Sequence, residues 1–372
     1  MMISYKYRIY PNKTQKEMLS KTFGCVRFLW NKNVEVFNNK GEFKSSTFYR
    51  EEFDFLREVS AGALQQKEKD FKQFKNQFFS KDRKKKLGRP SFKSKRDKQS
   101  FRLPNQKFTL KDNKIRLEKI GWIKVKVDRT YSGREMSVTV SKDLTEKYYV
   151  SILVETEQIK KEKTGKQVGI DLGIKRLITT SDGLQIKNYS DNQGIKDIQR
   201  NLSRKKKGSR RYKELKLKLA KLHKKQSQKR DWLLHNISKY LVDNYDIIAM
   251  EDLSVENLLK NKMLADKISK SSLARLTNFV EYKSIMYGRD FYKINRYYPS
   301  SKKCCKCGKI KDDLKLSDRV YICDCGNKID RDLNASINIK TVGVHAVKQS
   351  VMDSTLPPEV RQAIPVELMN FL

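Results

Sequence analysis

The sequence predicts a multidomain protein of mixed α/β and α+β class, and three observations support this prediction. The chain has 372 residues, whereas a single domain usually has about 100–200. Its first half shows the alternation of apolar and polar residues that is typical of strands, interrupted by one long helical stretch. Its second half alternates short apolar strands with helical segments, as α/β proteins do.

The first half is expected to form a barrel-like sheet with a helical insertion. Residues 3–9 alternate apolar and polar side chains and predict a strand, which Pro11 closes. The sequence TQKE at 14–17 fits a capping box and opens a stretch that stays helical to about residue 80. Residues 101–155 read as strands throughout, so we expect the first strand to join this later sheet. The segment 156–166 has the composition of a linker.

The second half is expected to be an α/β unit. Residues 168–170 form an apolar strand, and residues 176–180 continue as a hairpin with a turn at 182–183. A long basic helix is predicted over 201–230, because leucines recur on one face of it. Residues 247–250 are apolar without alternation, which indicates a strand buried on both sides.

A large excess of positive charge indicates a polyanionic partner. Lysine and arginine total 82, aspartate and glutamate total 43, and the formal net charge is +39. Nucleic acid is the first candidate, because neutralising its phosphates releases counterions. A ribosomal-type protein or a membrane-surface protein is the alternative. No run of residues approaches the roughly 18–20 apolar positions of a membrane span, and we expect no signal peptide in the opening MMISYKYRIY.

Two cationic segments are candidate contacts for nucleic-acid backbone. Residues 81–98 hold ten basic and two acidic residues around Gly88 and Pro90, a composition that fits a solvated linker equally well. Residues 201–230 hold fourteen basic residues and one glutamate. From these segments we single out eight residues: Lys84, Lys85, Arg89, Arg204, Lys205, Lys206, Arg210 and Arg211.

Three carboxylates occupy positions that favour metal-dependent chemistry. Asp171 and Glu251 each end an apolar strand, and Asp332 lies just before a short predicted helix. Such a cluster raises a pKa or binds divalent cations. Mg2+ prefers carboxylates together with phosphates, and two ions roughly 4 Å apart activate water and stabilise a leaving 3′ oxygen. Each acid could instead be a turn or N-cap residue, and Asp330 and Asp252 compete with their neighbours for the role.

Five of the six cysteines lie between Cys304 and Cys325, which favours reduced thiolates holding a metal in a cytoplasmic protein. The pairs Cys304-x2-Cys307 and Cys323-x-Cys325 are each followed by glycine. Four thiolates with no open position are typical of structural zinc. Cys305 could replace a neighbour, and buried free cysteines are the alternative to a metal site. The sixth, Cys25, falls on the apolar face of the first helix and is expected to be a core residue.

Together these motifs resemble the TnpB (OrfB) family of bacterial insertion-sequence proteins, which is related to type V CRISPR effectors. The resemblance covers nearly the whole chain and rests on YKYRIYPNKTQKEMLSKTFGCVRFLWN, GRPSFKSKRDKQSFRLP, GIDLGIKRL, MEDLSVENL, YYPSSKKCCKCG and DRDLNAS. It implies an RNase H-like (RuvC-like) nuclease fold whose catalytic acids are Asp171, Glu251 and Asp332, the last being the second aspartate of its motif.

The resemblance also implies domains, cofactors and partners. A wedge β-barrel would comprise 1–12 and 101–160, with a helical recognition insertion at 13–100. The nuclease domain would span 166–345 with a zinc finger at 300–328, followed by a tail at 346–372. The implied activity is RNA-guided cleavage of DNA beside a short motif, with two Mg2+ ions and one Zn2+. A monomer bound to a guide noncoding RNA and target DNA, in the prokaryotic cytoplasm at the nucleoid, is expected.

Other functions fit part of the sequence. A DDE-type transposase would order its acids Asp, Asp, Glu, whereas glutamate is second here, and a junction resolvase would not need the basic first half. A non-catalytic RNA-guided DNA binder would have lost an acid, and all three are present. A plain RNA-binding protein predicts that Asp171→Ala changes no outcome on DNA.

Overall fold

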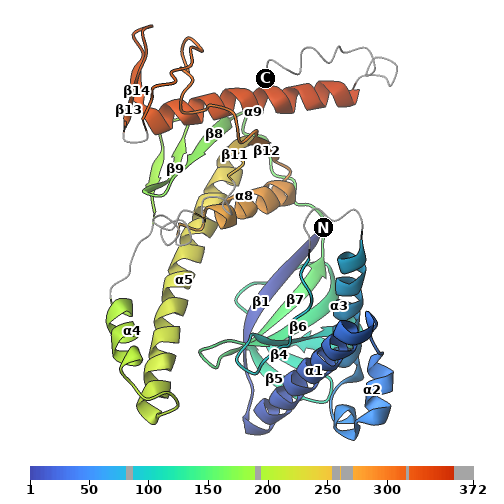
Figure 1. Ribbon diagram of the computed structural model, residues 1–372. Coiled ribbons are helices and arrows are strands. Elements are labelled where there is room, and N and C mark those ends of the chain that lie inside the picture. Colours follow the sequence, from blue (N-terminus) through green and yellow to red (C-terminus); the bar gives the residue numbers. More distant parts are fainter. Residues whose placement is uncertain (81–86, 189–193, 254–259, 261–270, 316–317, 356–372) are drawn as a thin grey trace. The chain divides into compact units, whose positions relative to one another are not determined.

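The chain folds into two compact units, Met1–Glu157 and Gln158–Leu372, each of which is described by itself (Figure 1). The computed structural model describes residues 1–80, 87–188, 194–253, 260, 271–315 and 318–355, with side chains up to residue 349. The candidate contacts Lys84 and Lys85, and the expected tail beyond residue 355, therefore lie outside the described residues. No helix in the described part of the chain is long and apolar enough to cross a membrane.

The first unit is built on a seven-stranded sheet with the order β2-β6-β7-β1-β5-β4-β3. Its strands are β1 (Met2–Tyr10), β2 (Gln99–Pro104), β3 (Phe108–Lys111), β4 (Lys114–Leu117), β5 (Gly121–Lys126), β6 (Arg134–Lys142) and β7 (Tyr148–Glu155). β1 pairs antiparallel with both β5 and β7, so the first strand joins strands that follow it much later in the chain. The sheet curls into an open half-barrel with β2 and β3 at its edges (Figure 1).

Between β1 and β2 the chain forms the helices α1 (Lys13–Lys40), α2 (Ser46–Glu52) and α3 (Ala61–Phe79), with a 3-10 turn at Asp54–Arg57. The expected capping box at 14–17 is displaced. Asn12 is the N-cap: its Oδ1 accepts the backbone N–H of Gln15 at 2.8 Å, and Gln15 Oε1 accepts the N–H of Asn12 at 3.0 Å. The helix starts earlier because β1 ends at Tyr10 and the extended Asn12 already turns the chain.

One apolar face of α1 packs against the sheet and forms the core of this unit. Leu19, Phe23 and Leu29 are buried in the same cluster as Phe101 from β2. Cys25 belongs to that cluster, as the sequence predicted, and burial raises the pKa of its thiol to about 11. A thiol in such surroundings is unreactive.

The second unit is a five-stranded sheet with the order β10-β9-β8-β11-β12. The strands are β8 (Gln167–Leu172), β9 (Arg176–Thr180), β10 (Gln185–Lys187), β11 (Ile247–Glu251) and β12 (Asp290–Ile294). β8, β9 and β10 pair antiparallel, whereas β11 runs parallel to both β8 and β12. This mixed sheet with helices on both faces is the RNase H-like arrangement that the family resemblance implied.

Helices cover the two faces of this sheet. α5 (Arg210–Asn244) and α8 (Leu273–Tyr287) pack on one face, where Leu241 and Val280 are buried with Val168, Ile170 and others of β8 and β11. α9 (Arg331–Thr355) crosses the other face, where Ile339 is buried with Ala249 and Ile294 (Figure 1). The strands are thus buried on both sides, which explains their uninterrupted apolar sequences.

Two helical expectations were wrong in extent. The basic helix predicted over 201–230 is two helices, α4 (Ile195–Ser203) and α5, which pack together around a turn. The break occurs because Gly208 adopts a left-handed φ of 88° and Ser209 caps α5 by accepting the N–H of Tyr212. The helix at Asp332 is long rather than short, and Asp332 lies in its first turn instead of before it.

Candidate active site and metal centre

Asp171 is the penultimate residue of β8, and Glu251 is the last residue of β11, its parallel neighbour. In the register of β8 and β11, Ile170 pairs with Met250, and each acid comes directly after its member of that pair. Side chains alternate between the faces of a sheet, and Ile170 and Met250 lie in the core under α5 and α8. The two acids therefore belong to the opposite face, which α9 covers.

Two glycines let α9 lie close against these strands. A Cβ at Gly169 in β8 would come within 2.1 Å of the carbonyl oxygen of Ser336 and 2.2 Å of the amide nitrogen of Lys340. A Cβ at Gly343 would come within 2.2 Å of the Ala249 side chain in β11. Each of these contacts joins α9 to one of the two strands. The helix that carries Asp332 therefore packs directly on the strands that carry the other two acids.

The three acids share one electrostatic environment. Burial raises the pKa of Asp171 well above its usual value, and the charges of Glu251 and then Asp332 raise it further. Burial also raises the pKa of Glu251, opposed by a hydrogen bond that the Ser300 hydroxyl donates to Glu251 Oε1. The charge of Arg331 acts in the opposite direction and lowers the pKa of Asp171. A carboxylate that is buried beside other acids is stabilised when a cation binds. The catalytic role of the three acids stays a prediction.

Hydrogen bonding separates Asp332 from its competitor Asp330. Asp330 Oδ1 accepts the N–H groups of Asp332 at 3.0 Å and Leu333 at 3.2 Å, so Asp330 is the residue that caps α9. Arg176 Nη1 on β9 lies 2.7 Å from Asp330 Oδ2 and 3.5 Å from Asp332 Oδ2. Burial would raise the pKa of Asp330, but the bonds from Arg176 and Leu333 lower it below its usual value. Asp330 is therefore committed to structure.

Asp252, the competitor of Glu251, is likewise occupied. Its Oδ2 lies 2.5 Å from Nη2 of Arg296, and both side chains are about two-fifths exposed. Sequence reasoning had not singled out Arg176 or Ser300. Arg176 lies inside the GIDLGIKRL motif, but nothing in one sequence indicates which acid it contacts 154 positions away.

The four cysteines form a cluster in which the sulfur atoms lie close enough together to hold one metal ion. The Sγ atoms of Cys304, Cys307, Cys323 and Cys325 all lie within 4.8 Å of one another. Cys304 and Cys325 are separated by 3.7 Å between sulfurs, and Cys307 and Cys323 by 3.5 Å. Four thiolates about 2.3 Å from a zinc ion would be spaced by a similar distance. Among the described residues, this cluster is the group gathered closely enough to hold an ion without rearrangement.

Local backbone geometry explains the two knuckles. Gly308 and Gly326 have φ values of 79° and 80°, the left-handed region that glycine enters without strain. Each donates its N–H to the first cysteine of its pair, to the carbonyls of Cys304 and Cys323, both at 2.9 Å. β13 (Val320–Ile322) and β14 (Lys328–Asp330) pair as a hairpin, and β14 leads directly into α9.

Cys305 lies outside the cluster. Its backbone N–H donates to Asn334 Oδ1 of α9 at 2.9 Å, and its Sγ lies 3.5 Å from Asn327 Nδ2. Asn327 Nδ2 also donates to Cys304 Sγ at 3.3 Å. Burial would raise the pKa of Cys304, but backbone N–H groups and Asn327 lower it to about 6, which favours the thiolate that a metal needs.

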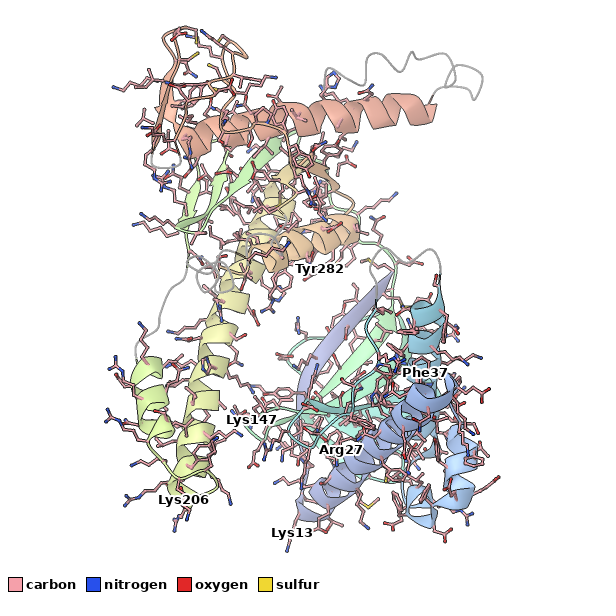
Figure 2. All side chains as sticks on the ribbon, viewed as in Figure 1. Lys13, Arg27, Phe37, Lys147, Lys206 and Tyr282 are labelled. Atoms are coloured by element: carbon pink, nitrogen blue, oxygen red, sulfur yellow. The ribbon has the colours of Figure 1, made fainter. Side chains whose placement is uncertain are left out.

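The described cationic candidates are exposed. The turn between α4 and α5 carries Arg204, Lys205 and Lys206, and Figure 2 shows Lys206 at the tip of this hairpin. Arg210 and Arg211 follow in the first turn of α5, where Arg210 Nε lies 3.0 Å from Glu214. Arg89 is exposed in the loop of the first unit. Their exposure permits contact with nucleic acid, and the contact itself stays a prediction.

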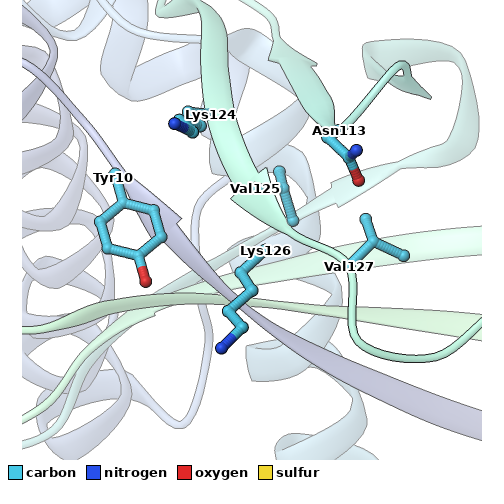
Figure 3. Close-up of a pocket in the computed structure, with 6 residues that line it drawn as sticks. All are labelled: Tyr10, Asn113, Lys124, Val125, Lys126 and Val127. Atoms are coloured by element: carbon cyan, nitrogen blue, oxygen red, sulfur yellow. The ribbon is translucent and has the colours of Figure 1, made fainter.

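An open pocket of about 570 Å³ lies in the first unit, where sequence reasoning had named no site. Figure 3 shows Tyr10 of β1 with Lys124 and Lys126 of β5 at this pocket. Tyr10 pairs with Lys124 in the register of β1 and β5. Exposed and buried residues alternate along most of β5, and this alternation could have indicated from the sequence that its lysines lie on the open face.

Comparison with known proteins places the chain in a family. Three family models match: "Probable transposase" (OrfB_IS605) over residues 151–262, "Cas12f1-like, TNB domain" over 274–339, and "Helix-turn-helix domain" over 1–36. A solved structure, "Cryo-EM structure of the Cas12f1-sgRNA-target DNA complex", matches with a TM-score of 0.53 and 14% identity, covering 91% of this chain and 98% of that chain. At that identity the match confirms the fold class alone.

The relatives are more similar in sequence. A Streptomyces pristinaespiralis protein named "Putative RNA-guided DNA endonuclease" is 35% identical over 92% of this chain and 90% of its own length. The Escherichia coli K12 protein "Putative RNA-guided DNA endonuclease InsQ" is 28% identical over 92% of each chain. The mimivirus "TnpB-like protein L79" is 34% identical over 37% of this chain. On this similarity along nearly its whole length, the chain belongs to the TnpB (OrfB) family of insertion-sequence proteins.

Proposed function

We propose that this protein is an RNA-guided DNA endonuclease of a transposable element, which cleaves target DNA next to a short flanking motif. The observation that supports the proposal is that Asp171 and Glu251 lie near the carboxyl ends of neighbouring parallel strands, while Asp332 lies in the first turn of α9, which packs on those strands. Relatives that match along nearly the whole chain are named for the same activity. Base pairing with a guide RNA would supply sequence specificity, while the protein contributes cationic surface.

Divalent cations fit the three acids. Asp171, Glu251 and Asp332 offer the hard oxygen ligands that Mg2+ prefers. Burial, and after it the charges of Glu251 and Asp332, raises the pKa of Asp171, and a bound cation would oppose this rise. Bound there, two Mg2+ ions would activate water and stabilise the leaving 3′ oxygen of the phosphodiester. Arg176, in ion pairs with Asp330 and Asp332, orients the start of α9 toward this edge. The four-cysteine cluster would hold one structural Zn2+.

The proposed assembly is a monomer bound to a guide noncoding RNA and to target DNA, in the prokaryotic cytoplasm at the nucleoid. In this proposal residues 1–12 and 101–160 form the wedge domain, 13–100 the recognition insertion, and 166–345 the nuclease domain with its finger at 300–328. Support comes from the net charge of +39 and from the exposed cations on the α4–α5 turn. Backbone contacts of this kind carry affinity rather than sequence information.

The test compares wild type with Asp171→Ala and the control Asp252→Ala, whose carboxylate pairs with Arg296. Each protein is co-expressed with its flanking genomic RNA, the bound RNA is sequenced, and plasmids with the matching target and a randomised flank are offered. We expect Mg2+-dependent cleavage by wild type and Asp252→Ala, none by Asp171→Ala, and enrichment of one flank. Target binding without cleavage by any of them would instead support a guided DNA binder, and the absence of discrete RNA would support a transposase or resolvase.

A further inference from the structure

A buried serine links the cysteine cluster to the acid edge. Ser300 lies between β12 and the first knuckle and is 5% exposed. Its hydroxyl donates to Oε1 of Glu251, and its own carbonyl accepts Nδ2–H of Asn338 at 2.8 Å. Both the side chain and the backbone of Ser300 are therefore held in place.

Two asparagines of α9 hold the chain segment that follows Ser300. Asn334 and Asn338 are 0% and 5% exposed, and both donate Nδ2–H to the carbonyl of Lys303, at 2.7 and 2.6 Å. Asn334 also accepts the N–H of Cys305 at 2.9 Å. Lys303 and Cys305 flank Cys304, the first cysteine of the cluster. The side chains of α9 therefore hydrogen-bond to the backbone on both sides of this cysteine. Both buried side-chain amides are thus hydrogen-bonded to backbone groups, as buried polar groups usually are.

We propose that Ser300 is a positioning residue of the nuclease centre: it holds the Glu251 carboxylate for metal binding, and Asn338 holds Ser300 by its backbone. The proposal rests on the proposed function, because it assigns Glu251 as a ligand. With Oε1 engaged by Ser300, the side chain is restricted to one orientation, in which Oε2 is available to an ion. Asp332 and the asparagines share α9, so the same helix positions two of the three acids.

The physical reason is that hydrogen bonds to ligating carboxylates set their orientation. Removal of such a partner typically reduces metal affinity or activity about 10- to 100-fold. A glutamate has several rotatable bonds, and it loses affinity if each binding event must first select one rotamer. The pair Ser300 and Glu251 is separated by 49 positions in the chain, so the restriction exists only in the folded protein.

The experiment measures Mn2+ binding by electron paramagnetic resonance on the zinc-loaded full chain. Variants are Ser300→Ala, the rescue variant Ser300→Thr, and the control Ser301→Ala, whose hydroxyl has no partner among the described residues. The Asp171→Ala variant measures how much Mn2+ binds outside the acid site. We expect Ser300→Ala to bind Mn2+ about 10- to 100-fold more weakly with unchanged zinc content and melting temperature. Ser301→Ala should match wild type, and Ser300→Thr should recover most of the affinity.

Unchanged Mn2+ affinity in Ser300→Ala overturns the proposal, as does a loss that Ser300→Thr fails to recover. The role of Asn338 is tested by the double-mutant cycle of Asn338→Ala with Ser300→Ala. If the double variant loses no more Mn2+ affinity than either single variant, Asn338 acts through Ser300. If the two losses of affinity add, this role of Asn338 is contradicted. Guided cleavage is assayed in parallel with target binding: slower cleavage by Ser300→Ala with unchanged target binding supports the assignment. If wild type binds Mn2+ at this site but cleaves nothing, the proposed function fails while the positioning result remains readable.

Discussion

At the scale of single residues, Cys304 and Cys305 show how neighbours in sequence diverge in role. Cys304 is 1% exposed and its sulfur lies in the four-cysteine cluster, whereas Cys305 is engaged by Asn334 through its backbone. The knuckle turn that Gly308 allows directs the two side chains differently. The spacing of cysteines alone could not exclude Cys305 as a ligand.

We predict that Cys304→Ser loses bound zinc while Cys305→Ser retains it. Loss of one thiolate opens a closed four-ligand site, and the energy of metal binding is also folding energy for a small finger. Zinc content by mass spectrometry and the melting temperature measure the two effects. Equal zinc content in both variants would refute the assignment.

Lys283 is a buried cation between α8 and α5. It is 9% exposed, and its ammonium donates to the carbonyl of His235 and to the hydroxyl of Ser238, both at 2.7 Å. Burial lowers its pKa from the ordinary lysine value of 10.5 to about 8. The unfolded chain therefore binds this proton more tightly than the folded protein.

From this shift we predict that stability relative to Lys283→Met rises with pH between about 8 and 10.5. Below this window both states are protonated, and the folded protein bears the cost of a buried charge. Within it the folded state releases the proton that the unfolded state keeps, so the free energy of unfolding increases by on the order of 3 kcal/mol. Denaturant titrations of both proteins at several pH values measure the difference. A flat difference would contradict the prediction.

At the scale of elements, the contact of α9 with β8 and β11 determines the acid edge. A helix can lie this close to a strand only where side chains are absent, and Gly169 and Gly343 supply that space. By contrast, Gly24 lies inside α1, where a Cβ would meet only the Arg27 guanidinium, at 4.0 Å. The same substitution at the two kinds of position should act in opposite directions.

We predict that Gly169→Ala destabilises the second unit by about 1–3 kcal/mol or more, because its Cβ would meet rigid helix backbone. Gly24→Ala should stabilise the first unit by about 0.5–1 kcal/mol, since alanine loses less conformational entropy in a helix. Hydrogen exchange followed by mass spectrometry reads the two units separately. If β8 and α9 in Gly169→Ala exchange their amide hydrogens as slowly as in wild type, the close packing of α9 on β8 at Gly169 is contradicted.

At the scale of the whole molecule, charge governs the proposed partners. The net charge of +39 remains after every acidic residue has been counted. Some of the cations lie in ion pairs, such as Lys21 with Glu58 and Lys32 with Glu35. The α4–α5 turn instead presents consecutive exposed cations from Arg204 to Lys207. Phosphates can neutralise the exposed cations of this turn without first breaking an ion pair within the described part of the protein.

Replacing Arg204, Lys205 and Lys206 together by alanine should weaken RNA binding and flatten its salt dependence. Each phosphate contact contributes about 0.7–0.9 to the slope of log affinity against log salt, so the slope should fall by about two to three. The control is Lys21→Ala with Lys32→Ala, which removes two cations that lie in ion pairs. Filter binding across a salt series gives both slopes, and an equal change in the control would remove the assignment.

Several features could be predicted from the sequence because they depend on local periodicity. Neighbouring residues in the chain were enough to predict the strands β1, β8 and β11 and the position of Asp171 and Glu251 at or next to strand ends. The spacing of the cysteines is likewise a local property of the sequence. The fold class was confirmed for the same reason: alternation in the first half and unbroken apolar strands in the second reflect how many faces of each sheet are buried.

The tertiary structure alone decided which residue takes which role. Asp330 rather than Asp332 caps α9 because its carboxylate meets the helix amides and Arg176, and Ser300 reaches Glu251 across the sheet edge. The turn at Gly208 separates α4 from α5, although the basic composition continues on both sides of it. Such outcomes depend on side chains that are distant in sequence and adjacent only after folding, or on a single backbone angle that overrides the surrounding pattern.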